Sequence, residues 1–487
     1  MKFPIGKIAK PIFVLFILLF TLSCNKDSEL LEEHISDNIS KSVLVEVRVL
    51  AAKNESVVIN PLIINQDSVS VISEVSEPAM GTVEINEDNS ITYTPDEDLV
   101  GTDEFTYTTE TENEEEPETG SITVSIREPI SEDVAHWQEQ FDIVWNNPST
   151  AINAYGMAKC MDYALSGGHS QEYYYLAWQL DAVIQIWQAT GDNAYLDDAL
   201  KIIETCISKA TSVRGGQYLG WSVTDLDSDF FVKHGSYLYE SYLFRFVATL
   251  LRIMHQSPNL REMDDYQSRY ENILEFTEVN IFEKWYTKSP GHDEMYLLNA
   301  HMSSHFARIG MELYIIKGDP VYKEVFDNIS FKGLPNRNGA NLRDQLHSNP
   351  KVPSAYTWAS KWDSPRVQDT SHGSDIVSFW VTAYENDMYW NKDDIDALIS
   401  TLNDVVWTVD EPLMFTANVD GTDGSNEFDA GFHSFISLGR FSEKLQSRIE
   451  RYYTIKTVRY KTSQAFGTGA LNRKILNDGR PVYPENY

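Results

Sequence analysis

The period of the hydrophobic pattern changes once along the chain, and this change is the strongest constraint on the fold. Between residues 42 and 128, apolar and polar residues alternate in short runs separated by Asn, Asp, Gly or Pro. From about residue 133 onward, the apolar residues recur every three or four positions. A period of 2 is typical of strands, and a period of 3.6 is typical of amphipathic helices. The sequence therefore predicts a small β domain followed by a large helical domain.

The β domain is expected to be a sandwich, because short alternating strands recur at regular spacing with turn residues between them. Gly81-Thr82-Val83, Tyr93-Thr94-Pro95, Gly101-Thr102-Asp103 and Phe105-Thr106-Tyr107 follow one another in this region. Their order resembles bacterial cadherin-like or immunoglobulin-like modules over residues 42–128. Such a module is expected to act as a spacer. The predicted strands cover residues 43–50, 56–64, 81–85, 90–95, 103–109 and 121–126.

The helical domain is predicted over residues 133–487, as an (α/α) toroid. One helix face is readable between residues 173 and 189, and Gly191 and Asp192 suit the end of that helix and the cap of the next. The same Gly-Asp punctuation returns at Gly318 and Asp319. Ten or more helices paired by short turns favour a closed ring. An open superhelix of helical repeats is the alternative, but it would need a repeat of constant length, which is missing.

The first residues resemble a bacterial lipoprotein signal. Lys2, Lys7 and Lys10 precede an apolar run at residues 12–22, which is too short to span a bilayer comfortably and ends before Cys24. Cys24 is then the lipidated N-terminus, and residues 25–41 form a polar tether. The acidic start of that tether resembles the export tag of Bacteroidetes surface lipoproteins. We expect an outer-membrane, surface-exposed protein; the alternative is an ordinary secretory signal with an incidental cysteine.

The charge balance excludes one class of partner. The chain has 39 Lys and Arg against 73 Asp and Glu, a formal charge of -34. Nucleic acid is not an expected partner, because the chain lacks the basic field that such binding requires. An anionic substrate would need cations concentrated at one place. Three cysteines give no disulfide framework.

Residues 296–384 hold the densest set of acid/base, cationic and aromatic side chains in the chain, and we expect the active site there. The set comprises Asn299, His301, His305, Arg308, Tyr356, Trp358, Lys361, Trp362, Arg366 and His372.

Several motifs resemble polysaccharide lyases with (α/α) barrels. They are ATGDNAYLDDAL at 189–200, FVKHGSYLYES at 231–241, LNAHMSSHFARIGMELY at 298–314, DTSHGSDIVSF at 369–379 and GFHSFISLGRF at 431–441. The likeness covers most of residues 133–455. It implies an enzyme that cleaves a uronic-acid polymer, with ulvan or glucuronan ahead of alginate, and without a required cofactor.

A lyase removes the C5 proton of a uronate and expels the oxygen at C4, so it needs a base, an acid and groups that neutralise the carboxylate. The resemblance implies a catalytic tyrosine, for which we take Tyr356 with His301 as its partner. Lys361 and Arg366 are expected to lower the pKa of that phenol. The side-chain amide of Asn299 is suited to hydrogen-bond the carboxylate of the uronate.

The two histidines of the 298–314 segment are four residues apart on one helix face. If the helix extends back far enough, Glu294 can orient His301. This spacing also allows zinc, but no third ligand is identifiable. For His305 the alternatives are substrate binding and a packed core histidine. Arg308 either binds substrate or pairs with Glu312.

His372 is predicted in the first turn of a helix that Ser371 or Thr370 caps, facing the cleft as a neutral base or hydrogen-bond donor. His234 and Tyr237 are expected on the opposite wall as substrate-binding residues. The segment 420–427 has oxygen-rich calcium-loop chemistry, although a solvated turn is the preferred interpretation.

Two other functions remain open at this stage. A glycoside hydrolase on the same fold needs two carboxylates across the cleft, and the candidates are Asp181, Glu294, Asp363 and Asp369. A surface glycan-binding lipoprotein without catalysis would present aromatic platforms instead of a His/Tyr/Arg cluster.

Overall fold

The structure is a computed structural model, and the residues that it describes are 47–64, 70–110, 117–151, 154–166, 170–212, 216–221, 229–263, 265–288, 294–410, 413–423, 425–426, 430–455 and 462–487. The chain forms two compact units, with the boundary between Glu128 and Pro129. The predictions for Cys24 and for residues 25–41 fall outside the described residues. Of the helices in the described part, none is both long and apolar enough to cross a membrane.

The first unit is a β-sandwich with a four-stranded and a three-stranded sheet. Strands β1 and β7 pair in parallel, whereas the other neighbours are antiparallel. Residues 61–64 form a short helix, α3 (Pro61–Ile64), where a strand was predicted, and β3 was not predicted. In sheet order the strands are β1 (Val47–Ala52), β7 (Glu118–Arg127), β6 (Gly101–Glu110) and β3 (Val71–Val75), then β2 (Val57–Ile59), β5 (Ile91–Pro95) and β4 (Gly81–Ile85).

A buried carboxylate ties the two sheets together. Asp103 on β6 accepts hydrogen bonds from the backbone N–H groups of Ala79 and Met80, each at 2.8 Å. It also accepts a bond from the hydroxyl of Tyr93 on β5, at 2.8 Å. The ring of Tyr93 stacks on Phe105 with centroids 5.8 Å apart. A buried carboxylate is stable only when its oxygens are bonded, so Asp103 fixes the register between the sheets.

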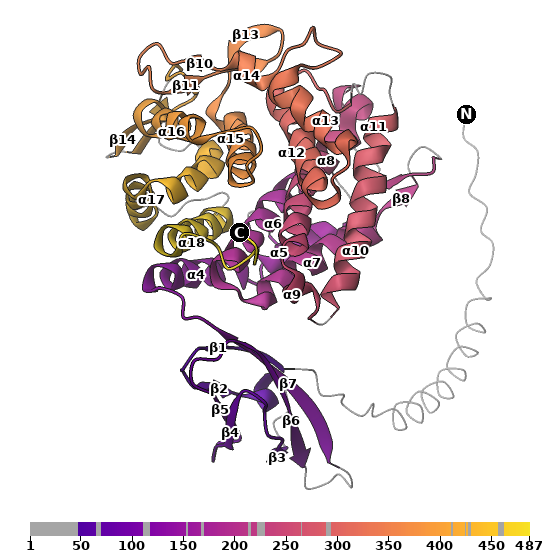
Figure 1. Cartoon of the computed structure of the whole chain (residues 1–487), viewed down its shortest axis with the longest axis vertical. Coiled ribbons are helices and arrows are strands. Elements are labelled where there is room, and N and C mark those ends of the chain that lie inside the picture. The colour runs from indigo at the N-terminus through magenta and orange to yellow at the C-terminus, as the bar shows by residue number, and fades with distance from the viewer. Residues whose placement is uncertain are drawn as a thin grey trace, which may run out of the picture. The chain divides into compact units, whose positions relative to one another are not determined.

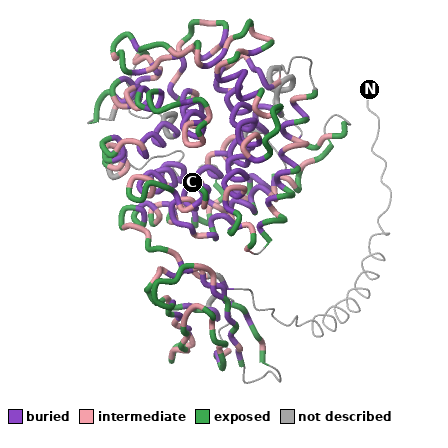
Figure 2. Tube along the Cα trace, in the orientation of Figure 1, coloured by how far each residue is buried: buried purple, intermediate pink, exposed green. Residues whose placement is uncertain are grey.

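The second unit is a closed ring of helices. Within the described residues, six inner helices each pack against the next, and the last packs against the first. Figure 1 shows this ring, and Figure 2 shows that its inner helices are buried over most of their length. The toroid is therefore confirmed, and the open superhelix is wrong. In ring order the inner helices are α6 (Ser170–Thr190), α8 (Asp229–His255), α12 (Ala300–Lys317), α15 (Thr370–Glu385), η4 (Ala430–Phe441) and α18 (Thr462–Asp478).

Each inner helix carries an outer helix against its back. The outer helices are α7 (Asn193–Ser208), α10 (Tyr266–Phe276), α13 (Pro320–Asp327), α16 (Lys392–Ser400), α17 (Glu443–Ile455) and α4 (Glu132–Trp145). Shorter helices and π-helical or single turns complete the layer: α5 (Met157–Leu165), α9 (Pro258–Arg261), η1 (Thr277–Glu283), α11 (Lys284–Lys288), η2 (Asn328–Lys332), α14 (Leu342–Gln345) and η3 (Thr401–Val406).

Short turns join inner to outer helices at one end of the ring. Gly191 and Gly318 adopt left-handed conformations with φ of 74° and 73°, which glycine tolerates at low cost. Asp192 and Asp319 then cap the next helix by accepting from the N–H groups of Ala194 and Val321. The predicted Gly-Asp punctuation is confirmed. We call this end of the ring the turn end.

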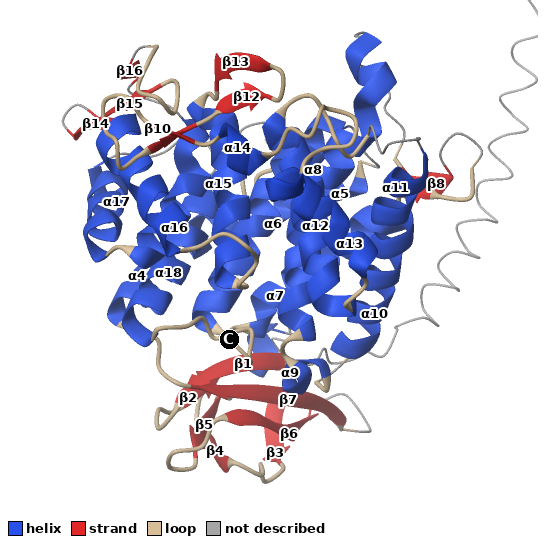
Figure 3. Ribbon diagram, turned by 45° about the horizontal axis from the view of Figure 1, so that its top comes forward, coloured by secondary structure: helices blue, strands red, loops and turns tan. Residues whose placement is uncertain are grey.

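The inner helices begin at the opposite end, which we call the loop end. Figure 3 shows β10, β12, β13 and β14–β16 gathered there. The small strands of the helical unit are β8 (Thr211–Ser212), β9 (Leu219–Gly220), β10 (His347–Ser348), β11 (Tyr356–Thr357), β12 (Ala359–Lys361), β13 (Ser364–Val367), β14 (Trp407–Asp410), β15 (Leu413–Thr416) and β16 (Ser425–Asn426).

Closure of the ring depends on a close approach of α18 to α6. A Cβ added to Gly467 would collide with the carbonyl oxygen of Ala182 on α6. Gly467→Ala is expected to lower the free energy of unfolding by about 1–3 kcal/mol, because backbone must move to admit the methyl group. Urea unfolding followed by helical circular dichroism measures this. Asn477→Ala, an exposed change on the same helix, is the control, and equal stability of the two variants would contradict the packing.

Candidate active site

Two backbone bridges fix the starts of α12 and α15 at the loop end. Asn299, the residue before α12, pairs with Lys361 of β12, and Asp369, the residue before α15, pairs with Asn418. The hairpin β12–β13 therefore runs from the start of α12 to the start of α15. The side chains in the first turns of both helices are held side by side as a result.

Asp369, His372 and His301 form a contiguous acid/base array. Nδ1 of His372 lies 2.8 and 3.0 Å from the two carboxylate oxygens of Asp369. The ring centroids of His372 and His301 are 4.2 Å apart. Asp369 also caps α15 by accepting from the N–H of His372. One carboxylate thus holds both the backbone and the ring of His372.

The charge states of this array differ from residue to residue. Burial raises the pKa of Asp369, but the bonds and charge of His372 outweigh burial and bring it down to about 2. Burial and, to a smaller extent, the charge of His372 lower the pKa of His301 to about 3. At neutral pH, Asp369 is therefore ionised and His301 is a neutral imidazole. Together with the ring of His372, they can bind, hold and transfer a proton.

A buried layer supports the array from below. Arg245 on α8 donates to Asp375 on α15 at 2.9 Å and lies 3.1 Å from Nδ1 of His305 on α12. Since a guanidinium can only donate, Nδ1 of His305 accepts and its proton is assigned to Nε2. Burial and Arg245 hold the pKa of His305 well below its usual range. His305 is therefore neutral and fixed.

Aromatic side chains from α6 and α8 flank this layer. The rings of Tyr174 and Tyr242 stack with centroids 3.8 Å apart. Trp178 donates to the hydroxyl of Tyr242 at 2.7 Å, and that hydroxyl lies 3.3 Å from Asp375. The guanidinium of Arg245 lies 4.1 Å from the Tyr242 ring centroid. Tyr242 is buried, whereas Tyr174 and Trp178 are half-buried.

The structure brings His301, His372 and Asn299 together at the loop end, as the sequence predicted. His305 lies one turn below, in the buried layer. Arg308 lies deeper still: it donates to Thr249 and Ser378 at 3.0 and 2.9 Å. Burial lowers the pKa of Arg308 to about 10. Neither of the two deeper residues is placed to meet a polymer at the loop end.

Tyr356 has other partners than those expected. Its hydroxyl donates to Asp394 at 3.0 Å, and Arg343 binds both oxygens of that carboxylate at 2.6 and 2.8 Å. Burial and Asp394 raise the pKa of Tyr356. The expected lowering of this pKa by Lys361 and Arg366 is wrong, because the charge beside the phenol is a carboxylate.

Four further expectations are corrected or fall outside the described residues. The cap of α15 is Asp369 rather than Ser371 or Thr370. Helix α12 begins at Ala300, so Glu294 stands in a preceding turn and not on the helix face of His301. Tyr237 is buried with its ring edge against Trp285, at 5.5 Å between centroids. The side chain of His234 lies outside the described residues.

Lys361 and Arg366 stand on the hairpin β12–β13. Arg366 is exposed and Lys361 is half-buried. Neither forms an ion pair with any carboxylate in the described part of the chain. In a protein with 73 acidic residues, this hairpin carries two cations against one carboxylate, the exposed Asp363, and so is a local exception to the charge of the whole.

Metal binding stays untested. Among the described side chains, no group of three or more His, Cys, Asp or Glu residues is arranged to hold an ion. The segment 420–427 is only partly described, and there Asp420 accepts from the N–H and hydroxyl of Thr422, as in an ordinary turn.

Sequence reasoning missed Arg245 and Asp375 entirely, and it considered Asp369 as a hydrolase carboxylate. A signal was present: Arg245 and Asp375 are each a single charge inside an otherwise apolar helical run, at FRFVATLL and SDIVSFWV. Buried charges of this kind are retained only with a partner.

The comparisons with known proteins place the first unit in a family and leave the second open. A family model described as a bacterial Ig domain matches residues 40–126, which confirms the predicted immunoglobulin-like module. No curated protein matches the chain.

Two solved structures with some likeness are family 76 glycoside hydrolases. One is an inactive variant of an alpha-1,6-mannanase from Salegentibacter sp. HEL1_6 in complex with alpha-1,6-mannotriose; it is 11% identical, with a TM-score of 0.37, covering 71% of this chain and 98% of that one. The other, from a bovine Bacteroides thetaiotaomicron strain, is 9% identical, with a TM-score of 0.35, covering 88% and 98%. These values are too low to carry a substrate or reaction over to this chain.

The neutral state of His301 predicts a pH effect on stability. An unfolded histidine has a pKa of about 6.5, whereas the folded value here is about 3. As the pH decreases from 7 to 5, the unfolded chain takes up a proton that the folded chain does not. The free energy of unfolding therefore decreases as the pH is lowered. His301→Asn is expected to remove about 2 kcal/mol of that loss at pH 5.

Urea unfolding at pH 7 and pH 5 measures this difference, and Asn299→Ala, a neighbouring residue that does not titrate, serves as the control. Parallel losses of stability in the wild type and in His301→Asn would show that His301 is protonated in the folded protein.

Proposed function

We propose that this chain is a carbon-oxygen lyase that cleaves a uronic-acid-containing polysaccharide by β-elimination at the loop end of the helical ring. The observation that carries the proposal is the pairing of His372 with Asp369 beside the neutral ring of His301. An imidazole oriented by a carboxylate is a general base suited to neutral pH. Residues 42–128 act as the spacer that carries this enzyme.

His372 is the base in this mechanism. Its Nδ1–H donates to Asp369, which leaves the lone pair of the ring on Nε2. Nε2 takes the proton from C5 of the uronate. The electron pair of the broken C–H bond forms the C4=C5 double bond, and the C4–O bond breaks. The ionised Asp369 stabilises the imidazolium that results, as a carboxylate does for a catalytic histidine.

In this mechanism the base and the leaving oxygen lie on the same side of the sugar ring. The imidazolium of His372 therefore returns its proton to O4, and the leaving sugar ends in a neutral hydroxyl group. His301 remains neutral throughout, since its pKa is about 3, and its ring is a hydrogen-bond donor for the charge that develops on the carboxylate. Asn299 stands beside His301 for the same task.

The anionic character of the substrate is supported by Lys361 and Arg366, which lack carboxylate partners within the described residues. A chain of charge -34 repels a polyanion at long range, so local cations are needed to hold one. Ulvan and glucuronan are the first substrates to test, and alginate is the next.

A glycoside hydrolase is the second candidate, and one observation favours it. Oε2 of Glu294, in the turn before α12, is buried with no hydrogen-bond partner in the described part of the chain. With Asp369 it would supply the two carboxylates that a glycosidase needs. The other carboxylates considered do not serve: Asp181 lies toward the turn end, and Asp363 is an exposed residue of the β12–β13 turn.

One assay separates the candidates. The chain without its predicted signal segment is incubated with ulvan, glucuronan, alginate and α-1,6-mannan, and both reducing ends and the ultraviolet absorbance of unsaturated uronate are recorded. New ends with that absorbance are expected. New ends without it would establish a hydrolase instead, and binding without new ends would establish a glycan-binding lipoprotein.

His372→Ala and Asp369→Asn are expected to lower kcat by about 10²–10⁴-fold, because each removes general-base catalysis. His347→Ala is the matched control, since His347 is an exposed histidine on β10, and it should retain activity. Tyr356→Phe should retain activity as well. Full activity of folded His372→Ala would remove the proposed mechanism, and loss of activity in Glu294→Gln alone would favour the hydrolase.

The lipid anchor is part of the same proposal. We expect the protein to sediment with outer membranes, and Cys24→Ala to remain with an uncleaved signal segment or appear in the soluble fraction. Metabolic labelling with a fatty acid gives the readout. A wild-type protein without label would show that the first residues are an ordinary secretory signal.

A further inference from the structure

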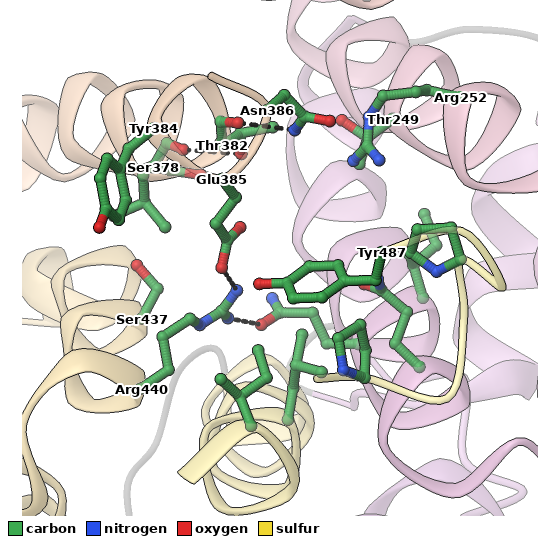
Figure 4. A pocket seen from close by; sticks show the side chains of 18 of the residues that line it. Thr249, Arg252, Ser378, Thr382, Tyr384, Glu385, Asn386, Ser437, Arg440 and Tyr487 are labelled. Atoms are coloured by element: carbon green, nitrogen blue, oxygen red, sulfur yellow. Dashed lines mark hydrogen bonds and ion pairs between the residues drawn. The ribbon is translucent and has the colours of Figure 1, made fainter. Parts of the chain in front are cut away.

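A cavity lies at the turn end of the ring, and none of the residues of the histidine array lines it. It has a volume of about 580 Å³ and is lined by the last turns of the inner helices and by residues 479–487. Figure 4 shows its walls: Thr249 and Arg252 on α8, Ser437 and Arg440 on η4, and Tyr487 across the middle. The wall from α15 carries Ser378, Thr382, Tyr384 and Glu385, with Asn386 just after the helix. The volume falls in the range of small-molecule sites, roughly 300–1,000 Å³.

The lining is dominated by groups that bind hydroxyls. It carries hydroxyl and amide side chains from five helices and the final residues: Gln185, Gln188, Thr249, Gln256, Ser378, Thr382, Asn386, Ser434, Ser437, Thr468 and Asn486. Tyr384, Phe441 and Tyr487 add ring surface. A cavity with many small donors and acceptors and a few rings matches the chemistry of a saccharide, which presents hydroxyls around an apolar ring face.

Two buried guanidinium groups in this lining have unused donors. Arg308 uses Nε and Nη1 to bond Thr249 and Ser378, and Arg252 uses Nε and Nη1 to bond Glu312 and Gln256. No partner for either Nη2 occurs within the described residues. Only 5% of the Arg308 side chain and 8% of the Arg252 side chain are exposed. Neither Nη2 is among the fully enclosed unpaired atoms, so both face the open volume of the cavity, where the oxygens of a ligand or of water can accept from them.

The two arginines Arg252 and Arg308 have few carboxylates close to them. Arg252 and Arg308 share a single close carboxylate, Glu312, at 2.6 and 3.9 Å. Burial raises the pKa of Asp181, which also lines the cavity, and a further lining carboxylate, Asp387, is exposed and forms no ion pair with either arginine within the described residues.

The third arginine of the lining is already neutralised. Arg440 donates to Glu385 at 2.9 Å, to Gln185 at 3.1 Å and to Asn472 at 3.1 Å. The arginines of the lining that have no carboxylate to themselves are therefore Arg252 and Arg308, which share Glu312.

We infer that this cavity is a second binding site, which takes a small saccharide carrying one carboxylate, with the carboxylate on Arg252 and Arg308 and the hydroxyls on the α15 and η4 walls. Tyr487 is half exposed, and its phenol is a hydrogen-bond donor and acceptor at neutral pH. Figure 4 places this hydroxyl beside Arg440 and Glu385, where it can donate to a sugar oxygen. The site does not depend on the reaction proposed for the loop end.

Isothermal titration calorimetry on the full chain in detergent tests the site, with glucuronate, methyl glucoside and sulfate as probes. Glucuronate is expected to bind at least about tenfold more tightly than methyl glucoside, because hydrogen bonds to charged groups distinguish the two. Ser437→Trp, which fills the cavity without removing a charge, should abolish this binding. Ser447→Trp, on the exposed side of α17, is the matched control and should leave it intact.

A second pair of variants tests the cations. Arg308→Lys keeps the charge but loses the planar fork, and it should weaken glucuronate binding about tenfold or more. Arg269→Lys, an ion-paired arginine on outer helix α10, should not change it.

Four results would overturn the inference. These are no binding of any probe, equal binding of glucuronate and methyl glucoside, sulfate binding as tight as glucuronate binding, and glucuronate binding that survives Ser437→Trp. None of them bears on polymer cleavage, so the site and the proposed lyase activity stand or fall separately.

Discussion

The buried ion pair between Arg245 and Asp375 is the interaction on which the helical unit most depends. It joins α8 to α15 across the interior of the ring, and through His305 it reaches α12, so three inner helices meet at one guanidinium. Removing one partner of such a pair leaves an uncompensated buried charge and costs about 3–5 kcal/mol. Because the first turns of α12 and α15 carry His301 and His372, the pair that aligns these helices also sets the distance between the two rings.

The same pair shapes the proton chemistry above it. A guanidinium beneath two imidazoles disfavours a positive charge on either, and burial acts in the same direction on His301 and His305. His372 alone of the three has an ionised carboxylate bonded to its ring. A proton that enters this group therefore rests on His372, beside Asp369, and not on the two deeper histidines. The three imidazole rings are chemically the same, but their surroundings differ. Only the surroundings of His372 favour the protonated ring.

The sequence predicted what depends on short-range pattern. The change of period, the Gly191-Asp192 and Gly318-Asp319 punctuation and the first-turn position of His372 were all readable locally. Tyr356 was misassigned because its partner, Asp394, is 38 residues away, and the carboxylate raises the phenol's pKa where local lysine and arginine suggested lowering it. The cap of α15 was misassigned for another reason, since Asp369, Thr370 and Ser371 all suit a cap, and only the bond to His372 decides among them.

The architecture separates two kinds of cation by their solvation. At the loop end, Lys361 and Arg366 stand on a surface hairpin, where water stabilises them and where their attraction for a polyanion is weakened by salt. At the turn end, the side chains of Arg252 and Arg308 are largely buried within the ring, where salt screens them little. The hairpin cations therefore suit a long, mobile chain that must move on after cleavage. The buried pair suits one small anion that stays, because a carboxylate can accept from both guanidinium groups at a place where salt weakens the attraction little.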